Sequence, residues 1–112
     1  MRRFVAIACL AVLSTAALVA TAPAATPVYK GPVGPGFTIK LAKAPKKAGK
    51  AKIVVADLSS SHNFHLTGPG VNVKTSVGGK GTKTFTVTLR KGTYTYVCDP
   101  HKSFMKGSFK IR

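Results

Sequence analysis

The sequence predicts an all-β domain, an antiparallel sandwich of about seven strands, and three observations support this fold class. From residue 37 onwards, apolar and polar residues alternate in short runs, and no helical period of 3.6 is sustained. Threonine and valine, which favour strands, are frequent in these runs. Glycine-rich turns separate the runs from one another. Short strands joined in this way are typical of two packed antiparallel sheets.

The residues before this domain are predicted to form a secretory signal peptide followed by an N-terminal arm. Residues 1–24 combine two arginines, an apolar run over Phe4–Ala20 and an A-x-A pattern ending at Ala24, the features of a secretory signal peptide. We expect cleavage after Ala24 and a protein outside the cytoplasm, either extracellular or in the periplasm or cell envelope. Retention of the run as a transmembrane anchor is the alternative. Residues 25–36 hold three prolines and three glycines and are expected to form an N-terminal arm.

Residues 37–112 are predicted to form the folded domain. We expect its strands over residues 37–41, 53–56, 62–66, 71–77, 82–90, 93–98 and 107–112. In the first of these, Phe37, Ile39 and Leu41 share one face, which should be buried. Residues 42–51, with four lysines around a proline and a glycine, are expected to form a solvated loop.

The charge of the chain is strongly one-sided. It carries 18 Lys and Arg against two acidic residues, Asp57 and Asp99, for a formal net charge of +16. Loss of Arg2 and Arg3 with the signal peptide lowers this charge to +14. Such a field favours an acidic redox partner protein or an anionic cell-surface component, and solubility alone is the alternative role. Export argues against nucleic acid as the partner, and we expect a monomer.

Three potential metal ligands lie within eight residues near the C-terminus. Cys98, His101 and Met105 have the spacing C-x2-H-x3-M, at the end of a predicted strand and across the turn that follows. Thiolate, imidazole and thioether groups together suit copper, and His62 or His65 could supply a second imidazole. Two histidines, one cysteine and a weak axial methionine are the ligands of a blue-copper electron-transfer site.

The two upstream histidines are expected to differ in role. His62 and His65 lie three residues apart and therefore face opposite sides of a strand. Phe64 and Leu66, the expected core residues, share the face of His62, so His62 should point towards the other ligands. His65 should then lie at the surface or behind the ligands. Asn63 should point away from the core, where its amide could hydrogen bond across the two ligand segments.

A lone cysteine also needs an explanation in an exported protein. Cys9 leaves with the signal peptide, so Cys98 becomes the only cysteine of an 88-residue mature chain and no internal disulfide can form. A free thiol outside the cytoplasm is open to oxidation unless a metal, burial or an intermolecular disulfide protects it. Taken singly, a buried Cys or Met is more often inert packing than a ligand. The joint spacing of the ligand types favours the metal site.

These segments resemble a known family. HNFHL at 62–66 and GTYTYVCDPHKSFMKGSF at 92–109 are similar to the ligand segments of the plastocyanin and azurin family of cupredoxins. The resemblance runs from about Phe37 to Ile111 and implies a cupredoxin-like Greek-key sandwich. It implies one copper ion as cofactor, with the ligands His62, Cys98, His101 and Met105. The proline that usually precedes the first histidine is replaced here by Ser61.

The resemblance also implies where electrons would pass. His101 would present its imidazole edge at a partly exposed apolar end of the molecule. Phe104 would belong to that patch, with Lys102 and Lys106 beside it to steer an acidic partner. Tyr94, four residues before the cysteine, resembles the residue of a tyrosine corner.

Three functions remain open from the sequence. The first is an electron carrier that cycles between Cu(II) and Cu(I). The second is copper or zinc binding without electron transfer, for storage or delivery. The third is a metal-free adhesive module for anionic surfaces, whose function would survive Cys98→Ser. An enzyme is not expected, because the ligand cluster contains no strong acid or base and the chain has only three histidines.

Overall fold

The computed structural model describes residues 11–17 and 25–112 of the chain. Most of the predicted signal peptide, residues 1–10 and 18–24, lies outside the described residues. Within the described part, no helix combines the length and the apolar character that a membrane crossing requires.

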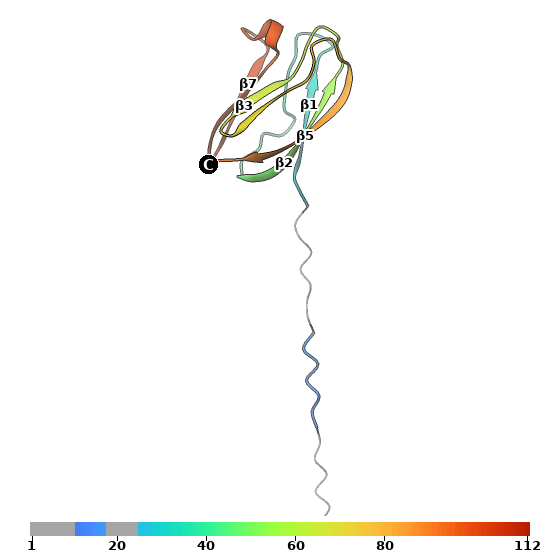
Figure 1. Cartoon of the computed structure of the whole chain (residues 1–112), viewed down its shortest axis with the longest axis vertical. Coiled ribbons are helices and arrows are strands. Elements are labelled where there is room, and N and C mark those ends of the chain that lie inside the picture. The colour runs from blue at the N-terminus through green and yellow to red at the C-terminus, as the bar shows by residue number, and fades with distance from the viewer. Residues whose placement is uncertain (1–10, 18–24) are drawn as a thin grey trace, which may run out of the picture.

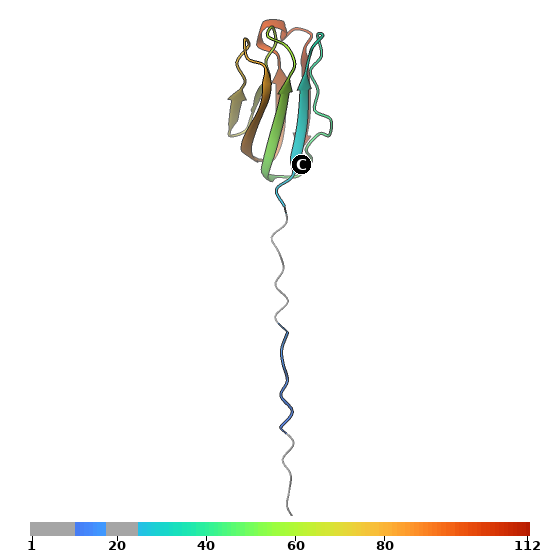
Figure 2. The same ribbon diagram turned by 90° about the vertical axis from the view of Figure 1, so that its right-hand side faces the viewer.

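Seven strands form two sheets that pack face to face around one core (Figures 1 and 2). The strands are β1 (Val28–Val33), β2 (Gly49–Asp57), β3 (His65–Gly68), β4 (Val71–Lys74), β5 (Gly81–Leu89), β6 (Gly92–Val97) and β7 (Lys106–Ile111). One sheet has the order β1-β2-β5 and the other β4-β3-β6-β7. A single turn of 3₁₀ helix, η1 (Asp99–His101), joins β6 to the loop before β7. The all-β sandwich of about seven strands is confirmed.

One strand pair differs from the purely antiparallel arrangement. The pairs β2–β5, β3–β4, β3–β6 and β6–β7 are antiparallel, whereas β1 and β2 run parallel, from Val28 opposite Lys52 to Val33 opposite Asp57. A parallel pair needs a long crossover, and the connection over residues 34–48 supplies it.

The first strand lies earlier than the sequence predicted. β1 occupies the middle of residues 25–36, so the expected arm is wrong for Val28–Val33. Pro32 is tolerated there because β1 is an edge strand that pairs on one side only. The strand predicted over residues 37–41 is not formed. Within this range, only Ile39 makes an isolated β-bridge, to Val33.

The third predicted strand begins three residues late, at His65. The preceding residues His62, Asn63 and Phe64 are buried in a loop. Phe64 donates its backbone N–H to Thr75 Oγ1 and accepts from the Thr75 N–H through its carbonyl, in place of a strand ladder. The remaining predicted strands overlap the observed ones with shifted ends.

The core draws on both sheets. Its largest fully buried side chains include Tyr94, Phe64, Ile53, Leu66, Leu89 and Ile111. Tyr94 stacks on Phe109, with ring centroids 5.2 Å apart. The Tyr94 hydroxyl accepts from the Arg90 backbone N–H and donates to the Pro69 carbonyl, both at 2.8 Å. This side chain thus ties the β5–β6 turn to the β3–β4 turn.

The sandwich has two distinct ends. We call the end that carries η1 the η1 end, and the end where β1 begins and β7 finishes the far end (Figure 1). The strand registers place Asp57 and Gly81 at the η1 end and Gly49 and Leu89 at the far end.

Candidate metal centre

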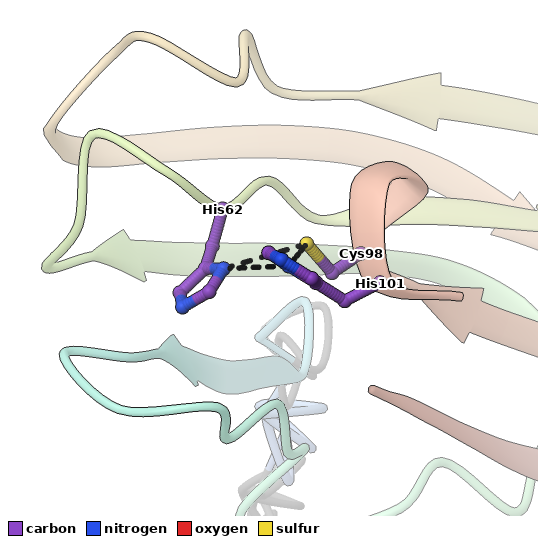
Figure 3. Close-up of side chains that lie close together, drawn as sticks. All are labelled: His62, Cys98 and His101. Atoms are coloured by element: carbon purple, nitrogen blue, oxygen red, sulfur yellow. Dashed lines mark hydrogen bonds between the residues drawn. The ribbon is translucent and has the colours of Figure 1, made fainter. Parts of the chain in front are cut away.

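Three side chains from separate segments meet at the η1 end (Figure 3). His62 comes from the loop before β3, Cys98 directly follows β6, and His101 lies in η1. The Cys98 Sγ atom is 3.7 Å from His62 Nδ1 and 3.6 Å from His101 Nδ1. The two Nδ1 atoms are 3.1 Å apart. One nitrogen of each histidine and the sulfur therefore face a common point.

The loop after β6 explains the spacing of the C-terminal ligands. Cys98 stands at the end of a strand that pairs with both β3 and β7, which fixes its backbone. The His101 N–H donates to the Cys98 carbonyl, and the Met105 N–H donates to the His101 carbonyl. The Cys98 N–H donates to the Met105 carbonyl at 3.0 Å and closes the loop. The spacing C-x2-H-x3-M therefore matches a loop whose last residue, Met105, hydrogen bonds to its first residue, Cys98.

The donor set and its dimensions fit a first-row metal ion. Protein imidazole nitrogen and thiolate sulfur bind zinc at about 2.0 Å and about 2.3 Å, so ligand atoms around one such ion lie about 3–4 Å apart. The three observed separations, 3.1, 3.6 and 3.7 Å, fall within this range. Among such ions, two imidazoles with one thiolate in a trigonal set favour copper.

The three residues differ in their exposure to solvent. Cys98 is fully buried and His62 is nearly so, whereas His101 is only partly buried. Water is therefore kept from the thiol, while the imidazole of His101 reaches the surface of the η1 end. Electron transfer to a docked partner would use this kind of edge.

Met105, the fourth predicted ligand, lies in the same closed loop. It is buried, and its backbone hydrogen bonds to both Cys98 and His101. A buried thioether beside a thiolate and two imidazoles has the chemistry of an axial copper ligand. Ligation by Met105 stays a prediction.

Asn63 joins the two ligand segments. Its Nδ2 group donates to Asp99 Oδ2 at 2.7 Å and to the Thr75 carbonyl at 3.2 Å, and its Oδ1 accepts from the Asp99 N–H at 2.7 Å. The sequence pattern predicted that this side chain points away from the core, but Asn63 is buried. Because Asn63 follows His62 and Asp99 follows Cys98, these bonds hold the two ligands at a fixed distance.

His65 is not part of the ligand cluster. Its Nδ1–H donates to Asp99 Oδ1 at 2.8 Å, and Nε2 lies 2.7 Å from Asn72 Oδ1. The hydrogen bond to Asp99 is the largest cause that raises the pKa of His65. Partial burial raises the pKa of Asp99, but the hydrogen bonds from His65 and Asn63 outweigh this and leave the pKa below its ordinary value. The pair adds a charged link behind the ligand loops.

Phe37 belongs to the site, and the sequence analysis missed it. It is 65 % exposed rather than in the core. Its ring centroid lies 5.4 Å from that of His62, 5.1 Å from that of His101 and 5.6 Å from that of Phe104. The aromatic ring therefore packs against both histidines. Its alternating neighbours indicated a strand, and no local signal distinguished the loop that forms instead.

The expected docking residues all lie at the η1 end. Phe104 is 58 % exposed and packs near the ring of His101, at a centroid distance of 5.5 Å. Lys102 and Lys106 flank it and are exposed. Phe37 and Phe104 together form an exposed apolar patch around the imidazole of His101. A docking role for these residues stays a prediction.

A model of the copper binding proteins of the plastocyanin/azurin family matches residues 35–112. Reduced rusticyanin is similar in structure, with a TM-score of 0.58 and 22 % identity over 76 % of this chain and 78 % of that chain. Reduced auracyanin from the photosynthetic bacterium Roseiflexus castenholzii is also similar, with a TM-score of 0.56 and 18 % identity. The match covers 80 % of this chain and 98 % of that chain. At these identities the structural likeness supports the fold alone. No curated protein sequence matches the chain.

Proposed function

This chain belongs to the plastocyanin/azurin family of copper-binding proteins, and on that premise we propose that it is a type 1 copper protein that carries single electrons outside the cytoplasm. Its cofactor is one copper ion. The observation that carries the proposal is the triangle of His62 Nδ1, His101 Nδ1 and Cys98 Sγ, with sides of 3.1–3.7 Å. When bound, copper supplies a one-electron couple between Cu(II) and Cu(I).

The protein's part is to hold the ligands in one arrangement. Cys98 is held by the end of β6, and His62 is held by a loop that Asn63 ties to the Cys98 segment. We assign Met105 as the weak axial ligand, at the close of the same loop. Ligands fixed by the sandwich rearrange little when the charge between them changes, which favours fast electron transfer.

Electrons would enter and leave at the partly exposed edge of His101. The exposed aromatic rings of Phe37 and Phe104 pack near His101 and would give a partner an apolar contact. Lys102 and Lys106 place positive charge beside that contact, so an acidic redox partner is favoured.

A hydrolytic or acid–base role has little support. Asp99 is the acidic residue nearest the ligands in the chain, and its carboxylate already accepts hydrogen bonds from Asn63 and His65. We therefore propose a carrier rather than an enzyme. We also propose export by the segment over residues 1–24, with the mature chain beginning at Ala25.

Voltammetry of the copper-loaded protein tests the proposal. We expect a reversible one-electron couple that survives repeated cycles and is lost in His62→Ala. Storage or delivery of copper, the alternative function, predicts tight binding with no reversible couple. Zinc bound in preference to copper at equal concentration would also contradict the proposal.

The docking surface can be tested with hexacyanoferrate(III), a small anionic oxidant. Lys102→Glu with Lys106→Glu should slow oxidation of the reduced protein about ten-fold at low salt. Lys46→Glu with Lys47→Glu, at the far end, removes the same net charge and should change the rate much less. The difference should shrink at high salt. Equal rates for the two double variants would contradict a docking role for the η1 end.

A further inference from the structure

The charges of the chain are distributed unevenly between its two ends. Both acidic residues lie at the η1 end, because Asp57 is the last residue of β2 and Asp99 follows Cys98. The one ion pair among the described residues, between His65 and Asp99, is also there. Among the described residues, the charged side chains at the far end are therefore all cations.

Six of these cations surround two adjoining hollows at the far end. They are Lys43, Lys46, Lys47, Lys50, Lys110 and Arg112. The larger hollow has a volume of about 550 Å³ and the smaller about 450 Å³. Lys46 lines both, so the cations form one continuous surface, which we call the far-end basic surface.

In the described part of the chain, no acidic side chain pairs with this surface. All six cations are exposed, and both acidic side chains, Asp57 and Asp99, lie at the opposite end of the sandwich. Concentrating so many like charges destabilises the folded protein unless an external anion compensates them. The lysines also sit on a loop and strand ends, where their flexible side chains can follow an irregular array of anions.

We propose that the far-end basic surface binds the anionic phospholipid headgroups of a membrane. Two observations favour a membrane over an acidic protein. Among the described residues, the exposed aromatic side chains are Phe37 and Phe104, and both lie at the η1 end. The chain also enters the fold here, since residues 25–27 line the larger hollow and the apolar run Phe4–Ala20 precedes them. The far end is therefore the part of the domain nearest the membrane during the proposed export, before cleavage after Ala24.

Binding in this way would orient the molecule. The far end would face the lipid, and the edge of His101 would face the solution at the opposite end of the sandwich. Several protein molecules could then stay at the membrane and exchange electrons with soluble partners. The binding itself needs no metal, so it can fail or succeed independently of the proposed electron transfer.

Vesicle co-sedimentation of the proposed mature chain, residues 25–112, which contains all seven strands, tests the proposal. The probes are vesicles of phosphatidylcholine with 30 % phosphatidylglycerol, compared with vesicles of phosphatidylcholine alone at the same low salt concentration. Without residues 1–24, insertion of the apolar run cannot hide a preference for the anionic headgroups. We expect a strong preference for the anionic vesicles, the same for copper-loaded and copper-free protein.

Two variants of equal charge locate the surface. Lys46→Gln, Lys47→Gln and Lys50→Gln together should weaken binding to anionic vesicles about 100-fold, because each lysine near the lipid contributes about five-fold. Lys80→Gln, Lys83→Gln and Lys106→Gln remove the same charge from the η1 end and should weaken it less than about five-fold. All six positions are exposed, so both triple variants should fold.

Three outcomes would overturn the proposal. Equal weakening in the two triple variants would mean that net charge, and not the far end, drives binding. Equal binding to anionic and neutral vesicles would exclude the headgroups as ligands. Tight binding to polyglutamate with weak binding to anionic vesicles would replace the membrane by an acidic protein.

Discussion

Both ends of the sandwich are braced by one buried polar side chain, but the two braces hold different things. At the η1 end, Asn63 hydrogen bonds to the residue after Cys98 and joins the two segments that carry the ligands. At the far end, Tyr94 joins two turns that contain no ligand. The same device therefore supports metal geometry at one end and the fold alone at the other.

The two ends also differ in how their charged groups are paired. At the η1 end, Asp99 is bonded to both His65 and Asn63, and the thiol of Cys98 is buried. In the part of the chain that the structure describes, the lysines of the far-end basic surface are exposed and form no ion pair with an acidic side chain. Metal binding depends on fixed distances, whereas attraction to an anionic surface depends only on the number and position of charges. Substitutions at each end test whether the two ends differ in this way.

The largest effect is expected for Asn63→Ala. The substitution leaves the Asp99 N–H and the Thr75 carbonyl without their partner and should cost about 2–3 kcal/mol of unfolding free energy. It should also lower copper affinity about 10–100-fold, since the ligand segments lose their link. Urea denaturation measures the first effect and competition with a copper chelator the second. A loss of stability with unchanged affinity would contradict the role of Asn63 as a ligand brace.

Tyr94→Phe is the matched change at the far end. It keeps the stacking on Phe109 and removes only the hydroxyl that bonds to Arg90 and Pro69. We expect a loss of about 1–2 kcal/mol of unfolding free energy. The visible spectrum and copper affinity should not change. A shifted spectrum would show that the two ends are coupled.

The smallest effect is expected from the ion pair of His65 and Asp99. The pKa of His65 is raised, so its stabilising contribution is complete below the ordinary value of 6.5 and is lost as pH rises through the raised pKa. The pKa of Asp99 is lowered, so its contribution is present above 3.8 and is lost as pH falls through the lowered pKa. Asp99 is 39 % exposed, and screening keeps the effect at about 0.5 kcal/mol.

His65→Gln isolates this contribution. The unfolding free energy of the metal-free protein, measured from pH 5 to pH 9, should fall at the alkaline side in wild type and change less in the variant. Identical pH profiles would contradict an ion pair between these two residues.

Local patterns in the sequence predicted the parts of the site that depend on neighbouring residues. The C-x2-H-x3-M spacing indicated a strand end followed by a turn that carries the remaining ligand types. The face shared with Phe64 and Leu66 selected His62 over His65, although His62 and Phe64 lie in a loop and not on the strand that this reasoning assumed. The fold class followed from strand alternation and turns in the same way. These features require only a few residues of context.

The features that the sequence did not predict are decided by distant partners. β1 forms because β2, whose paired residues lie 24 positions later in the chain, offers a parallel edge to a proline-containing strand. Phe37 then falls in the connection between them and lies on the histidines, although its alternation matches that of a strand. The burial of Asn63 likewise depends on Asp99, which is 36 residues away.

The visible absorption spectrum after addition of Cu(II), with wild type beside Cys98→Ser, tests most directly whether His62, Cys98 and His101 together bind copper. The account predicts an intense thiolate-to-copper band in wild type and no such band in the variant. A wild-type protein without the band, or a variant that keeps it, would contradict the account.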